Sequence, residues 1–333
     1  MNSKKHVLRI LSASFFLLLL ILNTSVAMQG ASDGIELCIN AVLPSLFPFF
    51  VLSAYLNRAL LGSSIPGVHR IASSLNIPKG GDAFLLLGLI GGYPVGAQLL
   101  SQAYAQHQIS RKTGNILLGY CSNAGPAFIF GMAGAFFSSK TIVFVLWGIH
   151  LISALITGYL LPRPQIESTN LNDNTGITVA TALRLGLNTC ATTCGWIIVF
   201  RIILAYINFW FFDSIGGILF VIVSGIFELS NGCLHLEQIS SEAIRFILFS
   251  SFLSFGGICV IMQTVSVTEH LGLGLYIPGK ILQTAISTTM ATIISYVLFP
   301  DAQISLYLSG FTCVLCLVSF LITNRFLKKR YGN

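Results

Sequence analysis

The stretch "GLIGGYPVGAQLL" at residues 88–100 interrupts an apolar run that is otherwise suited to a membrane helix. Gly92 and Pro94 cannot continue a regular helix, because glycine weakens it and proline lacks the backbone N–H group. The chain is interrupted again in "YCSNAGPAFIF" at 120–130. Unpaired backbone groups are costly in hydrocarbon, so broken membrane helices occur where protein, water or a ligand supplies the missing partners. The two breaks therefore predict a polar cavity inside the membrane.

The composition indicates a membrane protein. Of the 333 residues, 54% are hydrophobic and 9% are charged, against about 25% charged in a soluble domain. Several apolar runs reach the roughly 20 residues that cross a bilayer. We expect an all-α polytopic protein in the lipid bilayer, with only short connecting loops. The candidate runs are 7–27, 36–61, 83–106, 113–137, 140–161, 180–207, 214–236, 243–267, 272–298 and 304–326.

The N-terminal run is interpreted as a retained transmembrane helix at 1–30. Lys4, Lys5 and Arg9 precede it, and "SVA" at 25–27 resembles a signal-peptidase site, so cleavage is the alternative. Retention is favoured because multi-span proteins commonly use their first helix as the orienting signal.

The distribution of Lys and Arg favours a topology with two re-entrant hairpins, at 83–106 and 214–236. Positive residues collect on the cytoplasmic side. If every run crosses, thirteen of the 18 Lys and Arg residues fall inside, and with the hairpins fifteen do. The three that remain outside are Lys140, Arg201 and Arg245. Both topologies place the N- and C-termini in the cytoplasm, and the hairpins also place the loop at 107–113 there.

The two halves of the chain resemble each other weakly. Residues 107–130 align with 237–262, and "GGYPVG" at 91–96 corresponds to "FELSNG" at 227–232. Three full crossings would separate the two hairpins, so the repeats would be inverted, a plan known from secondary transporters. The expected organisation is an N-terminal helix (1–30), a first repeat (31–161), a cytoplasmic loop (162–178) and a second repeat with a C-terminal helix (179–333).

The substrate-binding residues are expected at the breaks. A half-helix that begins within the membrane directs free N–H groups and a positive dipole end into the cavity. Gly92 and Gly96 permit the turn and a close approach, and Pro94 and Pro126 suit the first turn of a half-helix. Taken singly, such residues also occur as packing surfaces, kinks or interhelical hydrogen bonds. The candidate residues are Gly92, Tyr93, Pro94, Gly96, Asn123, Gly125, Pro126, Glu228, Ser230, Asn231, Gly256 and Gln263.

Glu228 is the most informative acidic residue. It ends the apolar run "ILFVIVSGIFE" at 218–228. A carboxylate at this depth is costly and points to a function: holding a coupling cation, carrying a proton or binding substrate. The alternative is a loop acid at a hairpin tip that reaches solvent.

Two further helix faces carry polar residues. In 280–294, Gln283, Ser287 and Thr292 should meet protein or water rather than lipid. In 184–193, the residues at four-residue spacing are Arg184, Asn188 and Thr192, which weakly indicate an inward face. Arg184 at the membrane surface, with its side chain extended toward water, is the alternative.

Other classes of function lack support in the sequence. The pair Cys313 and Cys316 has no second CxxC and no nearby His, so neither a zinc site nor another metal site or cofactor is predicted. No nucleic-acid-binding motif is present. No arrangement of Ser, His and Asp suggests an enzyme.

The motifs "GGYPVGA" and "CSNAGPAFIFG" resemble the signature of the sporulation integral membrane proteins of the YlbJ type, which contain the nucleoside-recognition or gate domain. The resemblance covers about 30 to 320 and is strongest over 88–134. It implies a fold similar to concentrative nucleoside transporters, built from two gate-type repeats. It also implies an inner-membrane protein of a spore-forming bacterium that moves dipicolinate across the membranes around the forespore.

Three functions follow from these observations. The first is a secondary transporter of a small organic anion, with a coupling proton or cation. The second is a nucleoside permease, and the third is a sporulation membrane protein whose gate domain binds a partner without transport. The first hairpin tip holds Tyr93 and Gln98 but no acid, which favours an anion over a nucleoside.

Overall fold

Helices make up most of the described part of the chain. The computed structural model describes residues 2–164, 177–211, 217–300 and 306–331. No strand occurs in these residues, so the all-α prediction is confirmed. Within the same ranges, six helical stretches are long and apolar enough to cross a membrane. These are Thr24–Asn57, Lys140–Leu160, Val179–Phe211, Glu242–Val267, Tyr276–Leu298 and Leu308–Arg325.

The first crossing stretch is assembled from three helical segments. After α1 (Asn2–Leu22), helix α2 (Thr24–Leu37) continues through the π-helical turn η1 (Cys38–Val42) into α3 (Leu43–Leu60). Pro44 lies in the first turn of α3, where no intrahelical N–H bond is needed. The predicted run 36–61 thus begins inside a longer helical stretch.

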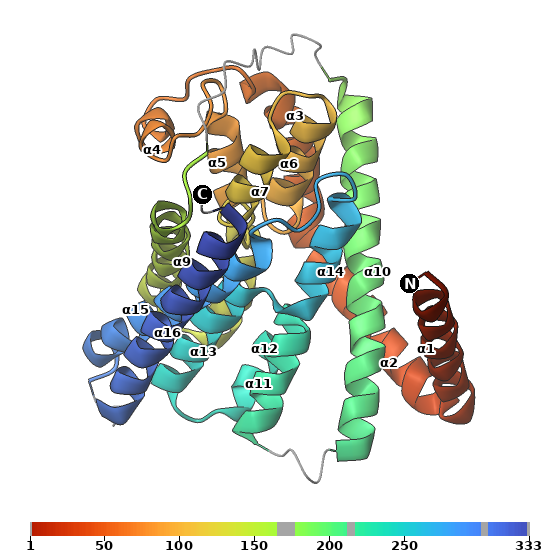
Figure 1. Cartoon of the computed structure of the whole chain (residues 1–333). Helices are drawn as coiled ribbons and strands as arrows, with labels where there is room; N and C mark the ends of the chain where they lie inside the picture. Colours follow the sequence, from red (N-terminus) through yellow and green to blue (C-terminus); the bar gives the residue numbers. More distant parts are fainter. Residues whose placement is uncertain (1, 165–176, 212–216, 301–305, 332–333) are drawn as a thin grey trace.

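Neither predicted hairpin forms a crossing helix. Residues 83–106 fold as α5 (Asp82–Ile90) and α6 (Val95–Ala105), of 9 and 11 residues. Residues 214–236 fold as α11 (Ile218–Phe227) and α12 (Leu229–His235). In each pair the chain turns back at the break, and the two short helices pack on each other. The first pair lies near the top of Figure 1 and the second near the bottom.

Glycines allow the two arms of each hairpin to meet. A Cβ atom added at Gly96 would lie 1.8 Å from the Cys121 carbonyl oxygen and 3.0 Å from the Gly88 Cα atom. In the second hairpin, a Cβ atom at Gly232 would lie 2.2 Å from the Gly225 Cα atom. The expected close approach at Gly96 is confirmed, and the alignment of 91–96 with 227–232 pairs Gly96 with Gly232.

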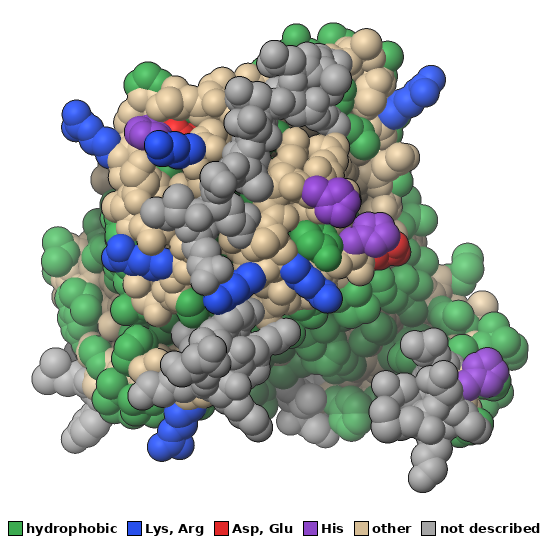
Figure 2. All heavy atoms as spheres, turned by 45° about the horizontal axis from the view of Figure 1, so that its top comes forward, with side chains coloured by type: hydrophobic (Ala, Val, Ile, Leu, Met, Phe, Trp, Pro, Cys, Tyr) green, Lys and Arg blue, Asp and Glu red, His purple; other side chains and the backbone are tan. Residues whose placement is uncertain are grey.

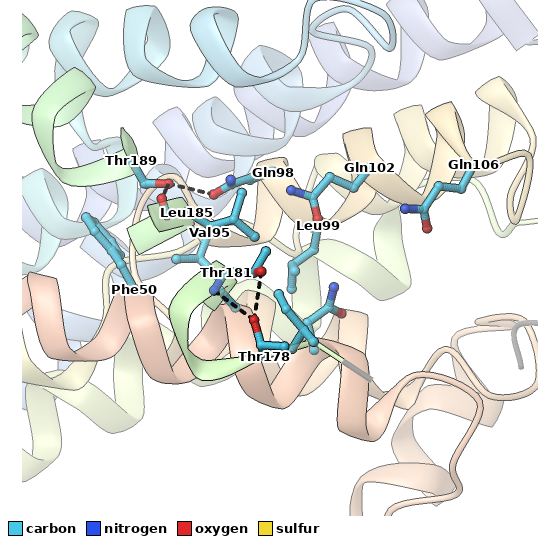
Figure 3. Close-up of a pocket in the computed structure, with 13 residues that line it drawn as sticks. Phe50, Val95, Gln98, Leu99, Gln102, Gln106, Thr178, Thr181, Leu185 and Thr189 are labelled. Carbon is cyan, nitrogen blue, oxygen red and sulfur yellow. Dashed lines mark hydrogen bonds between the residues drawn. The ribbon is translucent and has the colours of Figure 1, made fainter. Parts of the chain in front are cut away.

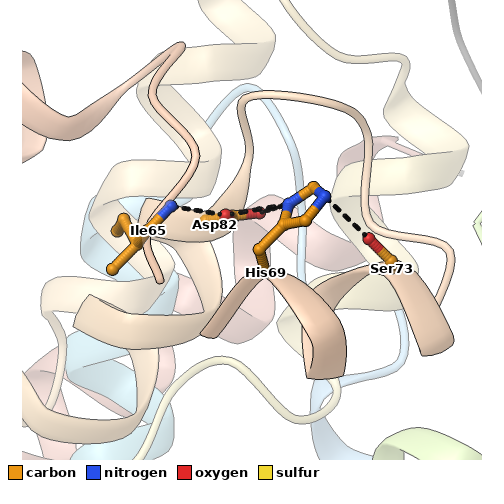
Figure 4. Close-up of polar contacts among 4 residues, drawn as sticks. All are labelled: Ile65, His69, Ser73 and Asp82. Carbon is orange, nitrogen blue, oxygen red and sulfur yellow. Dashed lines mark hydrogen bonds and ion pairs between the residues drawn. The ribbon is translucent and has the colours of Figure 1, made fainter. Parts of the chain in front are cut away.

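A polar contact holds the start of the first hairpin. Asp82 is 2% exposed at the first residue of α5. Its Oδ2 atom accepts a hydrogen bond of 2.9 Å from Ile65 N and lies 3.1 Å from His69 Nδ1. His69 belongs to the short helix α4 (Val68–Ser74), and Ser73 in turn contacts its ring (Figure 4). The α3–α4 connection is therefore anchored to the hairpin.

A broken helix follows each hairpin. After the first come α7 (Arg111–Leu118) and α8 (Pro126–Phe136), separated by residues 119–125. After the second and the short turn η2 (Leu236–Gln238) come α13 (Glu242–Phe255) and α14 (Gly257–Val267). Gly256, between them, has a φ of +79°, a left-handed conformation that favours glycine. The order of hairpin then broken helix occurs in both halves, while the inverted repeat itself stays a prediction.

Long helices enclose the broken ones. Helix α10 (Val179–Phe211) runs the height of the molecule and packs along α2 and α3. Helix α15 (Tyr276–Leu298) packs against α9 (Lys140–Leu160), α13 and α16 (Leu306–Tyr331) (Figure 1). Their outer faces carry exposed apolar residues such as Val297, at 80% exposure. Such a surface suits contact with lipid.

Candidate functional site at the two helix breaks

The breaks of both halves meet in the centre of the protein. The Tyr93 hydroxyl, at the first hairpin tip, donates a hydrogen bond of 3.2 Å to the Leu253 carbonyl in α13. A Cβ atom at Gly256 would lie 3.4 Å from Tyr93 Cζ. Gly92 has a φ of +85°, and its added Cβ atom would lie 3.5 Å from Gly125 N in the first broken helix. Tyr93 thus joins the first hairpin to the break of the second half.

A small central cavity, of about 30 Å³, lies between these elements. This is the volume of about one water molecule. Its walls come from both hairpin tips, from the break at 119–125 and from α3, α10 and α14. Five of the candidate residues line it: Tyr93, Gly125, Glu228, Ser230 and Gln263. Thr193 of α10 lines it too, and its buried hydroxyl has no hydrogen-bond partner.

Glu228 is buried at the second hairpin tip, with 2% exposure. Its two carboxylate oxygens accept backbone hydrogen bonds from Ser230 N at 2.9 Å and Asn231 N at 2.6 Å. The carboxylate therefore caps α12, so the expectation of free N–H groups at this half-helix is wrong. The alternative of a solvent-exposed loop acid is also wrong, because the tip lies inside the protein.

Arg201 approaches the same tip from α10. Its guanidinium donates a hydrogen bond to the Asn231 side-chain oxygen, and its buried Nε atom has no partner. The charge-based topology counts Arg201 with the outer loops. The structure instead places it within the 33-residue helix α10, in contact with the hairpin. The positive charge of Arg201 therefore lies beside the hairpin tip that carries Glu228, and not in a loop.

Lys280 is the most deeply buried cation at the centre, with 1% exposure. Its Nζ atom donates hydrogen bonds to Tyr93 Oη at 3.1 Å, Asn123 Oδ1 at 3.0 Å and Gln283 Oε1 at 2.7 Å. The Tyr93 ring centroid is 5.0 Å from Nζ. These partners are neutral, and among the described residues no carboxylate lies within ion-pair distance of Nζ. When this amine is protonated, it has no counter-ion among the described residues and would strongly attract an anion.

Asn123 fixes the first break around this lysine. Its Nδ2 group donates to Gly88 O at 3.1 Å and Tyr120 O at 2.7 Å, while Oδ1 accepts from Lys280 and from Gln283 Nε2. The amide therefore uses its full set of donors on backbone groups that the interrupted helices leave unpaired. These hydrogen bonds pair the backbone carbonyls at the break, where no water is needed to pair them.

His150 of α9 connects the two breaks. Its Nε2 atom accepts a hydrogen bond of 3.1 Å from Ala124 N, and its Nδ1 atom lies 3.3 Å from Ser254 Oγ. An accepting Nε2 requires a neutral ring that carries its proton on Nδ1. The histidine therefore holds the break at 119–125 next to the end of α13.

The sequence patterns missed Lys280 and His150. The charge-based topology counts Lys280 with its nearer, cytoplasmic loop, although the side chain is buried within α15. The usable signal was its place inside the apolar run 272–298, since an ionisable residue within a span is a functional candidate by default. His150, inside the run 140–161, carries the same signal.

The polar faces were predicted with mixed success. Gln283, Ser287 and Thr292 are fully buried, as expected for 280–294. In α10, by contrast, Arg184, Asn188 and Thr192 are exposed, so the inward face predicted for 184–193 is wrong. The face that turns inward is one residue further along the helix, at Leu185, Thr189, Thr193 and Ile197.

The remaining candidate residues shape the site without lining the cavity. Pro126 begins α8, as expected, and Pro94 immediately precedes α6. Gly256 forms the second break and touches Tyr93. Asn231 joins Arg201 to Glu228 through the contacts described above.

Comparison with known proteins supports the expected resemblance. The chain is 30% identical over 162 residues to "Sporulation integral membrane protein YlbJ" of Bacillus subtilis (strain 168). The match covers 45% of this chain and 38% of the relative, so the chain spans about two fifths of the length of the curated protein that it matches. No protein-family model matches the chain, and no solved structure matches it. The chain is thus an integral membrane protein similar to YlbJ.

Proposed function

We propose that this protein is a secondary transporter of a small organic anion. The observation that carries the proposal is Lys280, a buried cation held only by neutral oxygens beside two helix breaks. A substrate anion that enters the adjacent cavity would supply the counter-charge that the described residues do not provide. Because a buried charge interacts strongly across a low dielectric, this attraction would favour anions over neutral solutes.

The resemblance to YlbJ suggests which anion and which membrane. We propose dipicolinate as the substrate, in the cell membrane or the membranes around the forespore, with both chain termini in the cytoplasm. The central cavity of about 30 Å³ holds no more than a water molecule. An aromatic dicarboxylate is several times larger, so binding requires the hairpin tips to separate. The conformation with this small cavity would then be a closed one.

Glu228 is the proposed coupling group. Its carboxylate lines the same cavity and is held by Ser230 N and Asn231 N. Protonation, or an approaching cation, would weaken these bonds and loosen the second hairpin tip. In this way an ion gradient would drive the opening of the cavity by acting on Glu228.

The test is the uptake of labelled dipicolinate by proteoliposomes, with competition by unlabelled acids and nucleosides. The proposal expects accumulation driven by a proton or cation gradient, and competition by dicarboxylates only. Competition by nucleosides at similar concentrations would favour the permease. No uptake of either class by correctly folded protein would favour a binding role without transport.

A further inference from the structure

A groove of about 480 Å³ opens between α3, α6 and the beginning of α10. This volume is in the range of sites for small molecules. Helix α6 and the beginning of α10, which line the groove, lie toward the upper end of Figure 1, as do the loops before α4 and α7. Figure 2 shows Lys and Arg side chains spread over this end. Arg111 and Lys112, at the start of α7, are exposed. The positive residues identify it as the expected cytoplasmic end.

The groove has an apolar wall that carries a row of polar, uncharged side chains. Gln98, Gln102 and Gln106 follow one another at four-residue spacing along α6 and face it (Figure 3). Thr178, just before α10, and Thr181, in its first turn, face it from the other side. No Lys, Arg, Asp or Glu is among its 13 described lining residues. Such a row of amides and hydroxyls can exchange hydrogen bonds with a polar solute without trapping it by charge.

One lining residue indicates that the groove is built to hold a ligand or water. Asn57 of α3 is 6% exposed, and its Oδ1 atom is buried without a hydrogen-bond partner. A buried amide oxygen without a donor is costly, and none of the described residues supplies one, so water or a ligand in the groove would satisfy it. The groove is the space that this side chain lines.

The inner end of the groove lies one helical turn from the central cavity. On α10, Thr189 lines the groove and Thr193 lines the cavity, and on α3 the same relation holds for Phe50 and Leu46. Between the two spaces lie Phe50 and Val95, which are 2% and 4% exposed. Phe50 and Val95 form a layer between the groove and the cavity. The Thr189 hydroxyl completes this layer by donating a hydrogen bond of 3.0 Å to Gln98 Oε1.

We propose that this groove is the cytoplasmic vestibule of the transport path, a first site for the small polar solute. Phe50, Val95 and the Thr189–Gln98 pair form the gate between the vestibule and the central cavity. The vestibule selects by hydrogen bonding, and the central lysine selects by charge. This inference rests on the proposed transport function.

The first experiment measures access by thiol labelling in membrane vesicles of both orientations. Gln102→Cys and Thr181→Cys probe the vestibule, Thr193→Cys probes the space behind the gate, and Leu187→Cys, 49% exposed on the outer face of α10, is the control. The five buried native cysteines can stay, and the three others are replaced by serine: Cys194, Cys313 and Cys316.

A membrane-impermeant cationic methanethiosulfonate should label the two vestibule positions from the cytoplasmic side only. The rate should exceed that of Leu187→Cys by at least about tenfold. Combining Thr193→Cys with Phe50→Ala should raise the labelling of Thr193→Cys by a similar factor. Vestibule positions that react no faster than Leu187→Cys, or a Thr193→Cys rate unchanged by Phe50→Ala, would overturn the proposal.

Uptake measured on the same variants separates the vestibule from transport itself. Labelling of Gln102→Cys should reduce dipicolinate uptake severalfold, while treated Leu187→Cys keeps its rate. Normal uptake after complete labelling of Gln102→Cys would reject the vestibule but leave the transporter intact. Absence of uptake before any labelling would reject the transport function, and with it a vestibule that serves transport, whatever the access pattern.

Discussion

Lys280 and Asn123 lie 157 residues apart in the sequence and are joined by a hydrogen bond of 3.0 Å between Nζ and Oδ1. Asn123 belongs to the break of the first half, and Lys280 to a long helix of the second. The asparagine also donates hydrogen bonds to the carbonyl of Gly88 in the first hairpin and to that of Tyr120 in the break. The Asn123 side chain therefore holds both the irregular backbone of the first break and the amine of Lys280.

The first prediction concerns the cost of this arrangement. Lys280→Met removes a buried charge while keeping much of the side-chain volume. Desolvation of such a charge costs several kcal/mol, which offsets the hydrogen bonds that it makes. We expect the thermal unfolding midpoint in detergent to stay the same or to rise. A midpoint lowered by more than about 5 °C, or roughly 2 kcal/mol, would mean that the lysine mainly stabilises the fold.

The second prediction concerns the packing of the first hairpin. Gly96→Ala places a methyl group where it would meet the Cys121 carbonyl oxygen, so backbone must move. Overpacking of this kind costs about 1–3 kcal/mol, and backbone contact puts the variant at the upper end. Gly131→Ala in α8 is the control, because nothing lies within 4 Å of its added Cβ atom. Equal unfolding midpoints for the two variants would contradict the described hairpin.

The third prediction concerns Glu228. Glu228→Gln removes the charge and the titratable site but keeps one acceptor for the α12 cap, whose loss costs about 1 kcal/mol. We expect Glu228→Gln to exchange substrate slowly without gradient-driven accumulation, and Glu228→Ala to do neither. Glu237→Gln, an exposed acid just after α12, should behave as wild type. Accumulation that persists in Glu228→Gln would remove Glu228 from the coupling path.

The fourth prediction concerns topology. Ser110 and Ser240 are exposed in the loops that follow the two hairpins. These loops lie at opposite ends of the molecule in Figure 1. Impermeant thiol reagents should therefore reach Ser110→Cys from the cytoplasm and Ser240→Cys from outside. Labelling of both from the same side would exclude the two opposed hairpins.

Much of this fold could be predicted from local chemistry. Gly92, Pro94 and Pro126 mark breaks because glycine and proline act on the backbone wherever they stand. Glu228 stood out because a carboxylate inside an apolar run needs an explanation. These signals depend on the residue and its neighbours in the chain.

The rest of the site depends on contacts that sequence spacing does not contain. The inward face of α10 was predicted one residue too early. The predicted strip begins at Arg184 and the strip that turns inward at Leu185, and only the packing of α10 against its neighbouring helices decides between them. Lys280 was not recognised as a site residue, because its partners, Tyr93 and Asn123, are distant in sequence. The capping of α12 by Glu228 likewise depends on the side-chain rotamer.

The most direct test of the account is dipicolinate uptake by proteoliposomes that contain wild-type protein, Lys280→Met or Lys140→Met. Lys140 is the matched control, because it is exposed at the start of α9. The account predicts gradient-driven accumulation by wild type and Lys140→Met, and at least a tenfold lower rate for folded Lys280→Met. An equal rate in Lys280→Met would contradict the claim that this buried cation binds the transported anion.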